Sequence, residues 1–165
     1  MTHSGRLPRR IGWTVAALCA GLAVPAAAQM TEELIQEEKD WSRARGNFVC
    51  SSVSYARADE EAGARHRETG LALGRPIVER ALARGVTPQT VMPHMRVHAQ
   101  ILATSPGADF ALGRIYQDLE LLFARRFLEH MEEAAAREDD REMAAAEFLD
   151  AAYADMGCET LGQPG

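Results

Sequence analysis

The stretch ADFALGRIYQDLELLFARRF, residues 108–127, carries the strongest amphipathic pattern in the chain. Its large apolar residues recur three and four positions apart, which places them on one face of an α-helix. They are Leu112, Ile115, Leu119, Leu122, Phe123 and Phe127. The pattern predicts a long helix that begins at Ala108-Asp109 and buries this face against other helices.

Working towards the N-terminus, the same helical spacing continues, with no alternating β-strand pattern and no Asn-Gly or Asp-Gly hairpin turn. Thr31 is expected to cap a first helix that runs to about residue 62, with a disturbance at Gly46-Asn47. Residues 63–74 contain three glycines and are either a weak helix or a connection.

Proline and glycine set the expected limits of the middle helices. Pro76 suits the first position of a helix that Gly85 ends, and Thr87-Pro88 repeats this start signal. The helix after Thr87 would present one apolar face and end at residues 105–107. That face consists of Val91, Met95, His98 and Leu102.

A charged interruption at residues 138–140 precedes the expected last helix, for which Gly157 is a fitting C-cap. Four or five helices joined by short turns favour antiparallel packing. The sequence therefore predicts an all-α fold, with residues 29–165 forming a single-domain antiparallel bundle of four to five helices.

Residues 1–28 have the three parts of an export signal. A head with three arginines precedes the uncharged apolar run Ile11–Val24, and Ala26-Ala27-Ala28 has the small-x-small pattern that signal peptidase reads. Cleavage is expected between Ala28 and Gln29. The apolar run is shorter than the ~20 residues that a membrane span needs, so we expect no stable membrane anchor after cleavage. The predicted location is periplasmic or secreted.

Cysteine usage agrees with export. Removal of the signal removes Cys19 and leaves Cys50 and Cys158. An even pair in an oxidising compartment usually forms a disulfide, so we predict that these two cysteines are bridged. Two buried, reduced thiols are the alternative.

The charge of the chain disfavours several partners. The formal net charge is −6, and the export signal carries no acidic residue, so nucleic acid and anionic membrane surfaces are unsuited as partners. Residues 41–100 carry nine arginines and five acidic residues, whereas residues 101–165 carry five arginines and fourteen acidic residues. Either oppositely charged helices pack together, or a dipolar surface orients a partner.

One segment concentrates soft metal ligands. Met92, His94, Met95 and His98 lie within seven consecutive positions. On an α-helix the two histidines, four positions apart, would project from the same side, and imidazole with thioether donors suits copper(I). The alternative is ordinary packing, because Met95 and His98 also belong to the apolar face.

The remaining candidates have simpler interpretations. His130 is expected at the edge of the core, and His66, among charged neighbours, on a solvated face. The small residues Ser51, Ser52 and Ser54 suggest a packing face, since no nearby base is arranged to activate a nucleophile. The chain contains no Cys-x-x-Cys-His, Glu-x-x-His, His-Glu-x-x-His or Gly-x-Ser-x-Gly motif and no glycine-rich phosphate loop.

The sequence therefore leads to an exported helical bundle that acts non-enzymatically by binding another protein, without a cofactor. Two alternatives remain open. One is a periplasmic copper- or soft-metal-binding protein that uses the Met92–His98 cluster. The other is an enzyme whose catalytic groups converge only in three dimensions.

Overall fold

The computed structural model describes the backbone of residues 26–86 and 93–161, and the side chains of residues 32–86 and 95–161. All regular structure in these ranges is helical, which confirms the all-α prediction. The elements are α1 (Ala26–Ala56), α2 (Glu60–Arg84), the 3₁₀ helix η1 (Pro93–His98), α3 (Ala99–Thr104), α4 (Ala108–Ala136), α5 (Arg141–Asp155) and α6 (Cys158–Leu161).

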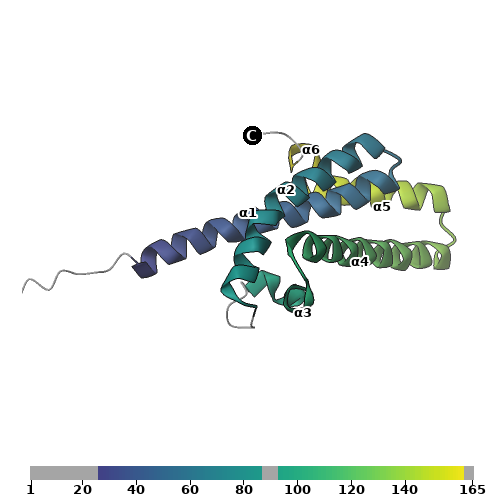
Figure 1. Ribbon diagram of the computed structural model, residues 1–165. Coiled ribbons are helices and arrows are strands. Elements are labelled where there is room, and N and C mark those ends of the chain that lie inside the picture. The colour runs from purple at the N-terminus through teal and green to yellow at the C-terminus, as the bar shows by residue number, and fades with distance from the viewer. Residues whose placement is uncertain (1–25, 87–92, 162–165) are drawn as a thin grey trace, which may run out of the picture.

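The long helices form a bundle of two hairpins (Figure 1). Helices α1 and α2 run antiparallel and share the most extensive contact in the molecule, while α4 lies against both of them. Helix α5 returns along α4, and the short α6 packs against α1. The bundle core lies where α1, α2 and α4 meet, and Trp41, Phe48, Ile77, Leu112 and Ile115 are almost completely buried there.

The turn between α1 and α2 comes earlier than the sequence suggested. Helix α1 ends at Ala56 rather than near residue 62, and Ala58 has a φ of 61°. Asp59 then caps α2, because its carboxylate accepts a hydrogen bond of 3.0 Å from the Ala62 backbone N–H. Glu60 and Glu61 follow at the positive end of the helix dipole. This cap is what allows two long helices to reverse direction within three residues.

Residues 63–74 are the interior of α2 and its contact face with α1. A Cβ at Gly70 would lie 2.7 Å from the Phe48 ring, and one at Gly63 would lie 2.8 Å from the Tyr55 ring. Phe48 and Tyr55 are two helical turns apart, as are the two glycines, so each ring occupies the space that a side chain on α2 would need. The glycines permit close approach of the helices rather than breaking α2.

Three other predicted boundaries are wrong. Pro76 lies inside α2, and α2 continues through residue 76 with only that residue's N–H missing from its hydrogen-bond ladder. Thr31 lies within α1 and is not an N-cap, and α1 also passes through Gly46 without a break. Gly46 instead makes room for α6, because a Cβ there would lie 3.0 Å from a Leu161 methyl carbon.

The helix predicted after Thr87 differs in kind. Thr87-Pro88 and Val91 lie outside the described residues. From Pro93 the backbone forms the 3₁₀ helix η1, which is followed by α3. The predicted apolar face is confirmed for Met95, His98 and Leu102, which are 0%, 5% and 1% exposed.

The second hairpin follows the sequence more closely. Helix α4 begins at Ala108, and residues 137–140 separate it from α5. The Asp140 carboxylate caps α5 by accepting hydrogen bonds from the N–H groups of Glu142 and Met143. Gly157 has a φ of 63° directly after α5, as its predicted capping role requires. Leu122, expected on the buried face, is 48% exposed.

A disulfide joins the last helix to the first. Cys50 of α1 and Cys158 of α6 are bridged across a sequence separation of 108, with their Cα atoms 5.5 Å apart. Both side chains are buried. The bridge is compatible with an oxidising compartment, and it fixes α6 over the C-terminal half of α1.

Exposed ion pairs join the oppositely charged halves of the chain. Arg57 contacts Asp150 at 3.0 Å, and Arg75 contacts Asp109 at 2.7 Å. Oppositely charged helices therefore pack together, as the first of the two interpretations of the charge pattern expected. Within the described ranges, no helix combines the length and apolar character that a membrane crossing requires.

Candidate functional site

The structure describes the predicted soft-metal segment in part. Met92 and the side chain of His94 lie outside the described residues. Met95 and His98 are both buried. Because η1 is a 3₁₀ helix, residues three apart share a face, whereas residues four apart do not. The backbone therefore places Met95 and His98 on one face of η1, while the expected alignment of His94 with His98 involves a side chain outside the described residues.

His98 is held against α1 without a polar partner. Its ring meets the Trp41 ring edge to face at a centroid distance of 6.2 Å. Neither ring nitrogen has a hydrogen-bond partner among the described residues. Burial lowers the pKa of His98 below its usual value, Arg45 lowers it further, and Asp118 opposes the shift. The imidazole is therefore neutral at pH 7 and retains a free nitrogen lone pair.

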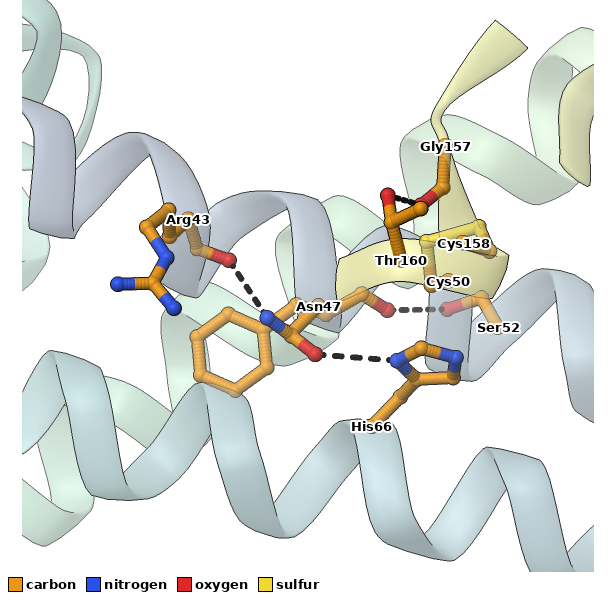
Figure 2. The surroundings of a disulfide bond; sticks show 9 residues. Arg43, Asn47, Cys50, Ser52, His66, Gly157, Cys158 and Thr160 are labelled. Carbon is orange, nitrogen blue, oxygen red and sulfur yellow. Dashed lines mark hydrogen bonds between the residues drawn. A yellow bond between two sulfur atoms is a disulfide. The ribbon is translucent and has the colours of Figure 1, made fainter. Parts of the chain in front are cut away.

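Sequence reasoning placed His66 on a solvated face, and this is wrong. His66 is fully buried between α2 and α1, where its Nδ1 lies 3.0 Å from Asn47 Oδ1. Asn47 in turn donates from Nδ2 to the Arg43 carbonyl oxygen at 2.9 Å. Figure 2 shows this chain of contacts in the surroundings of the disulfide.

This chain fixes the tautomer of His66. Because the Asn47 amide nitrogen is used towards a carbonyl, its oxygen faces His66, and Nδ1 must carry the proton and donate it. Burial lowers the pKa of His66, Arg65 adds to the decrease, and Asp59 opposes it. The neighbouring charged residues Arg65, Arg67 and Glu68 are exposed. Positions 63, 66, 70, 74 and 77 are spaced three or four apart and therefore share one helical face. This spacing could have predicted the burial of His66, provided that the glycines were counted as contact residues.

The serine cluster beside Cys50 is structural in its contacts. Ser51 donates to the Gly63 carbonyl oxygen at 2.8 Å and lies 3.2 Å from the Tyr116 hydroxyl. Ser52 donates to the Phe48 carbonyl oxygen within α1, as Figure 2 shows. The Ser54 hydroxyl is buried without a partner. No serine in the described ranges is hydrogen-bonded to His66 or His98, so these residues form no serine–histidine pair.

The remaining histidine is where sequence reasoning expected it, at the edge of the core. His130 is half-buried near the end of α4, and its ring lies 5.0 Å from the Phe148 ring of α5. Phe123 and Phe127 of α4 contact the same ring. The contact is aromatic packing between α4 and α5.

A concave site on the described surface lies where α1 extends along the last turns of α2. It is a groove of about 730 Å³ with mostly apolar walls. We call it the Glu37 groove; it is lined by Glu33, Leu34, Gln36, Glu37, Asp40, Arg80 and Arg84. Sequence reasoning did not identify it, because its two sides are more than forty positions apart.

A buried carboxylate organises this groove. The Glu37 side chain is only 6% exposed and pairs with Arg84 and, at 3.4 Å, with Arg80. The two guanidinium groups are half-exposed, so they can contact a ligand while Glu37 holds them in position. Arginine held in this way is a frequent contributor to protein–protein binding energy.

An apolar side chain lies beside these charges. Leu34 of α1 lines the groove and is 40% exposed. The groove therefore combines aliphatic surface, two oriented arginines and the acidic residues Glu33 and Asp40 at its edge. This combination suits a polypeptide ligand that offers an apolar side chain together with an acidic group that faces the two arginines.

A second, more polar hollow lies near the disulfide. Its volume is about 790 Å³, and Cys158, Tyr153 and Asp150 contribute to its wall. Arg57 is engaged on both sides, since it pairs with Asp150 and lies 4.4 Å from the Tyr153 ring centre. The positive charge of Arg57 is therefore paired within the chain. This makes the hollow a weaker binding candidate than the Glu37 groove.

Histidine, cysteine and carboxylate ligands do not gather on the described part of the chain. No group of three or more His, Cys, Asp or Glu side chains is placed there to hold an ion. The Met92–His98 segment is a separate case, because it contains thioether donors and because the side chains of Met92 and His94 lie outside the described residues. Comparisons with protein-family models, curated proteins and solved structures give no match for this chain.

Proposed function

We propose that this chain is an exported binding protein that acts in the periplasm or outside the cell by docking another protein, without catalysis. The observation that carries the proposal is the Glu37 groove, where a buried carboxylate orients two arginines beside exposed Leu34. The disulfide and the signal-like residues 1–28 support the location.

Export has a direct test. Mass spectrometry of the protein from the cell envelope should give a chain that begins at Gln29 and carries one disulfide. A product that retains residues 1–28, or that carries two free thiols, would contradict the proposed compartment.

Binding is tested by photo-crosslinking in the living cell. A benzoylphenylalanine probe at position 34 should give one discrete adduct with another protein, whereas the same probe at exposed Ala72 on α2 should not. The adduct should weaken at least tenfold when Arg84→Glu is added, because that change breaks the pair with Glu37 and reverses the charge offered to the ligand. Equal adducts from positions 34 and 72 would refute the groove as a docking site.

A second function, copper(I) binding, is favoured by a separate observation. Helix η1 aligns Met95 with His98, and both ring nitrogens of buried His98 lack partners among the residues that the structure describes. A neutral imidazole and a thioether are donors that copper(I) prefers. Together with Met92 and His94, they would form the proposed binding segment.

Titration of the mature protein with copper(I) against a competing chelator tests this function. Stoichiometric competition that is lost in the His94→Ala, His98→Ala double variant supports it. Lower stability of His98→Ala alone, with no competition by the wild type, would identify the segment as ordinary core.

A further inference from the structure

The outer face of α4 carries apolar side chains that no other part of the described chain covers. Phe110, Leu121 and Leu128 are 53%, 62% and 60% exposed. At ~100° per residue they fall within ~20° of one another around α4 and extend over ~27 Å of its length. The core-facing residues of α4, such as Leu119, lie on the opposite side. We call Phe110, Leu121 and Leu128 the α4 stripe.

Small residues follow one side of the α4 stripe, and charged residues follow the other. Gly113, Ala124 and Ala135 follow one side of it, eleven residues apart. A Cβ at Gly113 would meet nothing within 4 Å, so no contact inside the chain requires glycine there. An interior helical glycine costs about 1 kcal/mol relative to alanine, and close approach of an external helix would account for it.

The other border is self-complementary. Asp118 and Arg125 lie on it, and both are exposed; Arg125 also pairs with Glu129 of the same helix at 2.9 Å. In an antiparallel pair of identical helices, each border faces its own copy. In one antiparallel register, two residues of the paired α4 helices lie opposite each other when their numbers sum to about 245. Asp118 then opposes Arg125 of the second copy, and this pair occurs twice about the two-fold axis.

The same register matches large side chains with small ones. Leu121 then faces Ala124 of the second copy, and Phe110 faces Ala135 of the second copy. Alternation of large and small residues lets two helical surfaces interdigitate. This register thus combines two contacts between large and small residues with one repeated charge pair, while Leu128 faces Gln117 and Gly113 faces Glu132 of the second copy.

We propose that the α4 stripe is a homodimer interface in which two copies of α4 pack antiparallel about a two-fold axis. The proposal is independent of the Glu37 groove, which lies on α1 and α2 and stays open on each copy. A contact made by one helix per chain is at the small end of specific interfaces, so we expect a dissociation constant of ~10 µM.

Sedimentation equilibrium of the oxidised mature chain between 1 and 100 µM is the first measurement. A reversible monomer–dimer equilibrium is expected. Leu121→Asp should weaken it at least tenfold without changing thermal unfolding of the monomer. Leu34→Asp, at the groove, is the matched control and should leave it unchanged. A monomer at 100 µM, or a dimer insensitive to Leu121→Asp, overturns the proposal.

A charge exchange tests the register. Asp118→Arg and Arg125→Asp should each weaken the dimer, because each places like charges opposite each other twice. The double variant should recover most of the wild-type affinity, since the opposite charges face each other again. If the double variant is as weak as the single variants together, the antiparallel register is wrong. Crosslinking at the groove is unaffected by these changes, so the two proposals fail separately.

Discussion

The two helical hairpins of this protein differ in how closely their side chains are packed. Between α1 and α2, aromatic rings fit over glycines, and Trp41, Phe48 and Val78 are fully buried. Along the second half of α4 and α5, only Ala134, Ala144 and Leu149 are buried, while Leu121 and Leu128 face outwards. The first hairpin is the structural core, and the second carries apolar surface that only an external contact would bury. Substitutions in the two hairpins should therefore have different effects on stability.

The largest effect is expected from the bridge that ties the two hairpins together. Cys50→Ala with Cys158→Ala should lower the free energy of unfolding by up to about 4 kcal/mol, because the cross-link restricts a long loop in the unfolded chain. Helical content in water should persist, since α1 and α2 pack without the bridge. Urea unfolding followed by circular dichroism measures both. A loss below about 1 kcal/mol would show that α6 is held by packing alone.

A truncation in each hairpin compares their packing directly. Phe48→Ala should cost about 3–4 kcal/mol, because it leaves a cavity over Gly70 in the core. Leu128→Ala, at a 60% exposed position, should cost less than about 0.5 kcal/mol in the monomer. Chemical unfolding below 1 µM protein keeps self-association out of the measurement. Similar losses for both variants would refute the contrast between the hairpins.

Glycine-to-alanine substitutions test the same difference in packing by adding a methyl group instead of removing a side chain. Gly70→Ala should destabilise by about 2 kcal/mol, since the new Cβ meets the Phe48 ring and the Ala44 carbonyl oxygen, the latter at 3.1 Å. Gly113→Ala meets nothing and should stabilise the monomer by up to about 1 kcal/mol through helix propensity. If Gly70→Ala also stabilises, α1 and α2 are less closely packed than the structure describes.

The smallest effect is expected from pH, through the two buried histidines His66 and His98. Burial lowers the pKa of both His66 and His98, so the unfolded chain binds more protons than the folded one below pH ~6.5. Stability should therefore be complete above that pH and fall as the pH decreases through it. Urea unfolding at pH 7.5 and pH 5.0 measures this difference.

Replacing His98 sharpens the pH experiment. His98→Leu should be at least as stable as the wild type at pH 7.5, because neither ring nitrogen has a partner to lose, and it should show a weaker decrease at pH 5.0. His66→Leu should be less stable at both values, since it strands the Asn47 amide oxygen. Identical pH profiles for the wild type and His98→Leu would exclude His98 as a source of the acid sensitivity.

Sequence reasoning recovered what depends on large apolar residues and on cysteine number. The helical class, the start of α4 and the Cys50–Cys158 bridge follow from spacing and compartment. It failed where small residues make the contact. Gly63 and Gly70 left residues 63–74 undecided between a weak helix and a connection, because their partners, the rings of Tyr55 and Phe48, lie on another helix.

The polar part of the core was equally hidden. His66 looked solvated because its neighbours in sequence are charged, whereas its burial is set by the α2 register. The Glu37 groove joins residues of α1 and α2 that only the hairpin brings together. The α4 stripe lay within the best-recognised helix, but which side of that helix stays uncovered depends on the packing of the other helices.

The sequence positions of the two bridged cysteines also impose an order of assembly. Cys50 lies in α1, and Cys158 follows it by 108 positions. A chain made from its N-terminus contains the residues of the first hairpin long before it contains Cys158. The Cys50 thiol therefore has no Cys158 thiol to pair with until α2 to α5 have been made. Closure of the bridge is thus a late event, and only then can it hold Leu161 over Gly46.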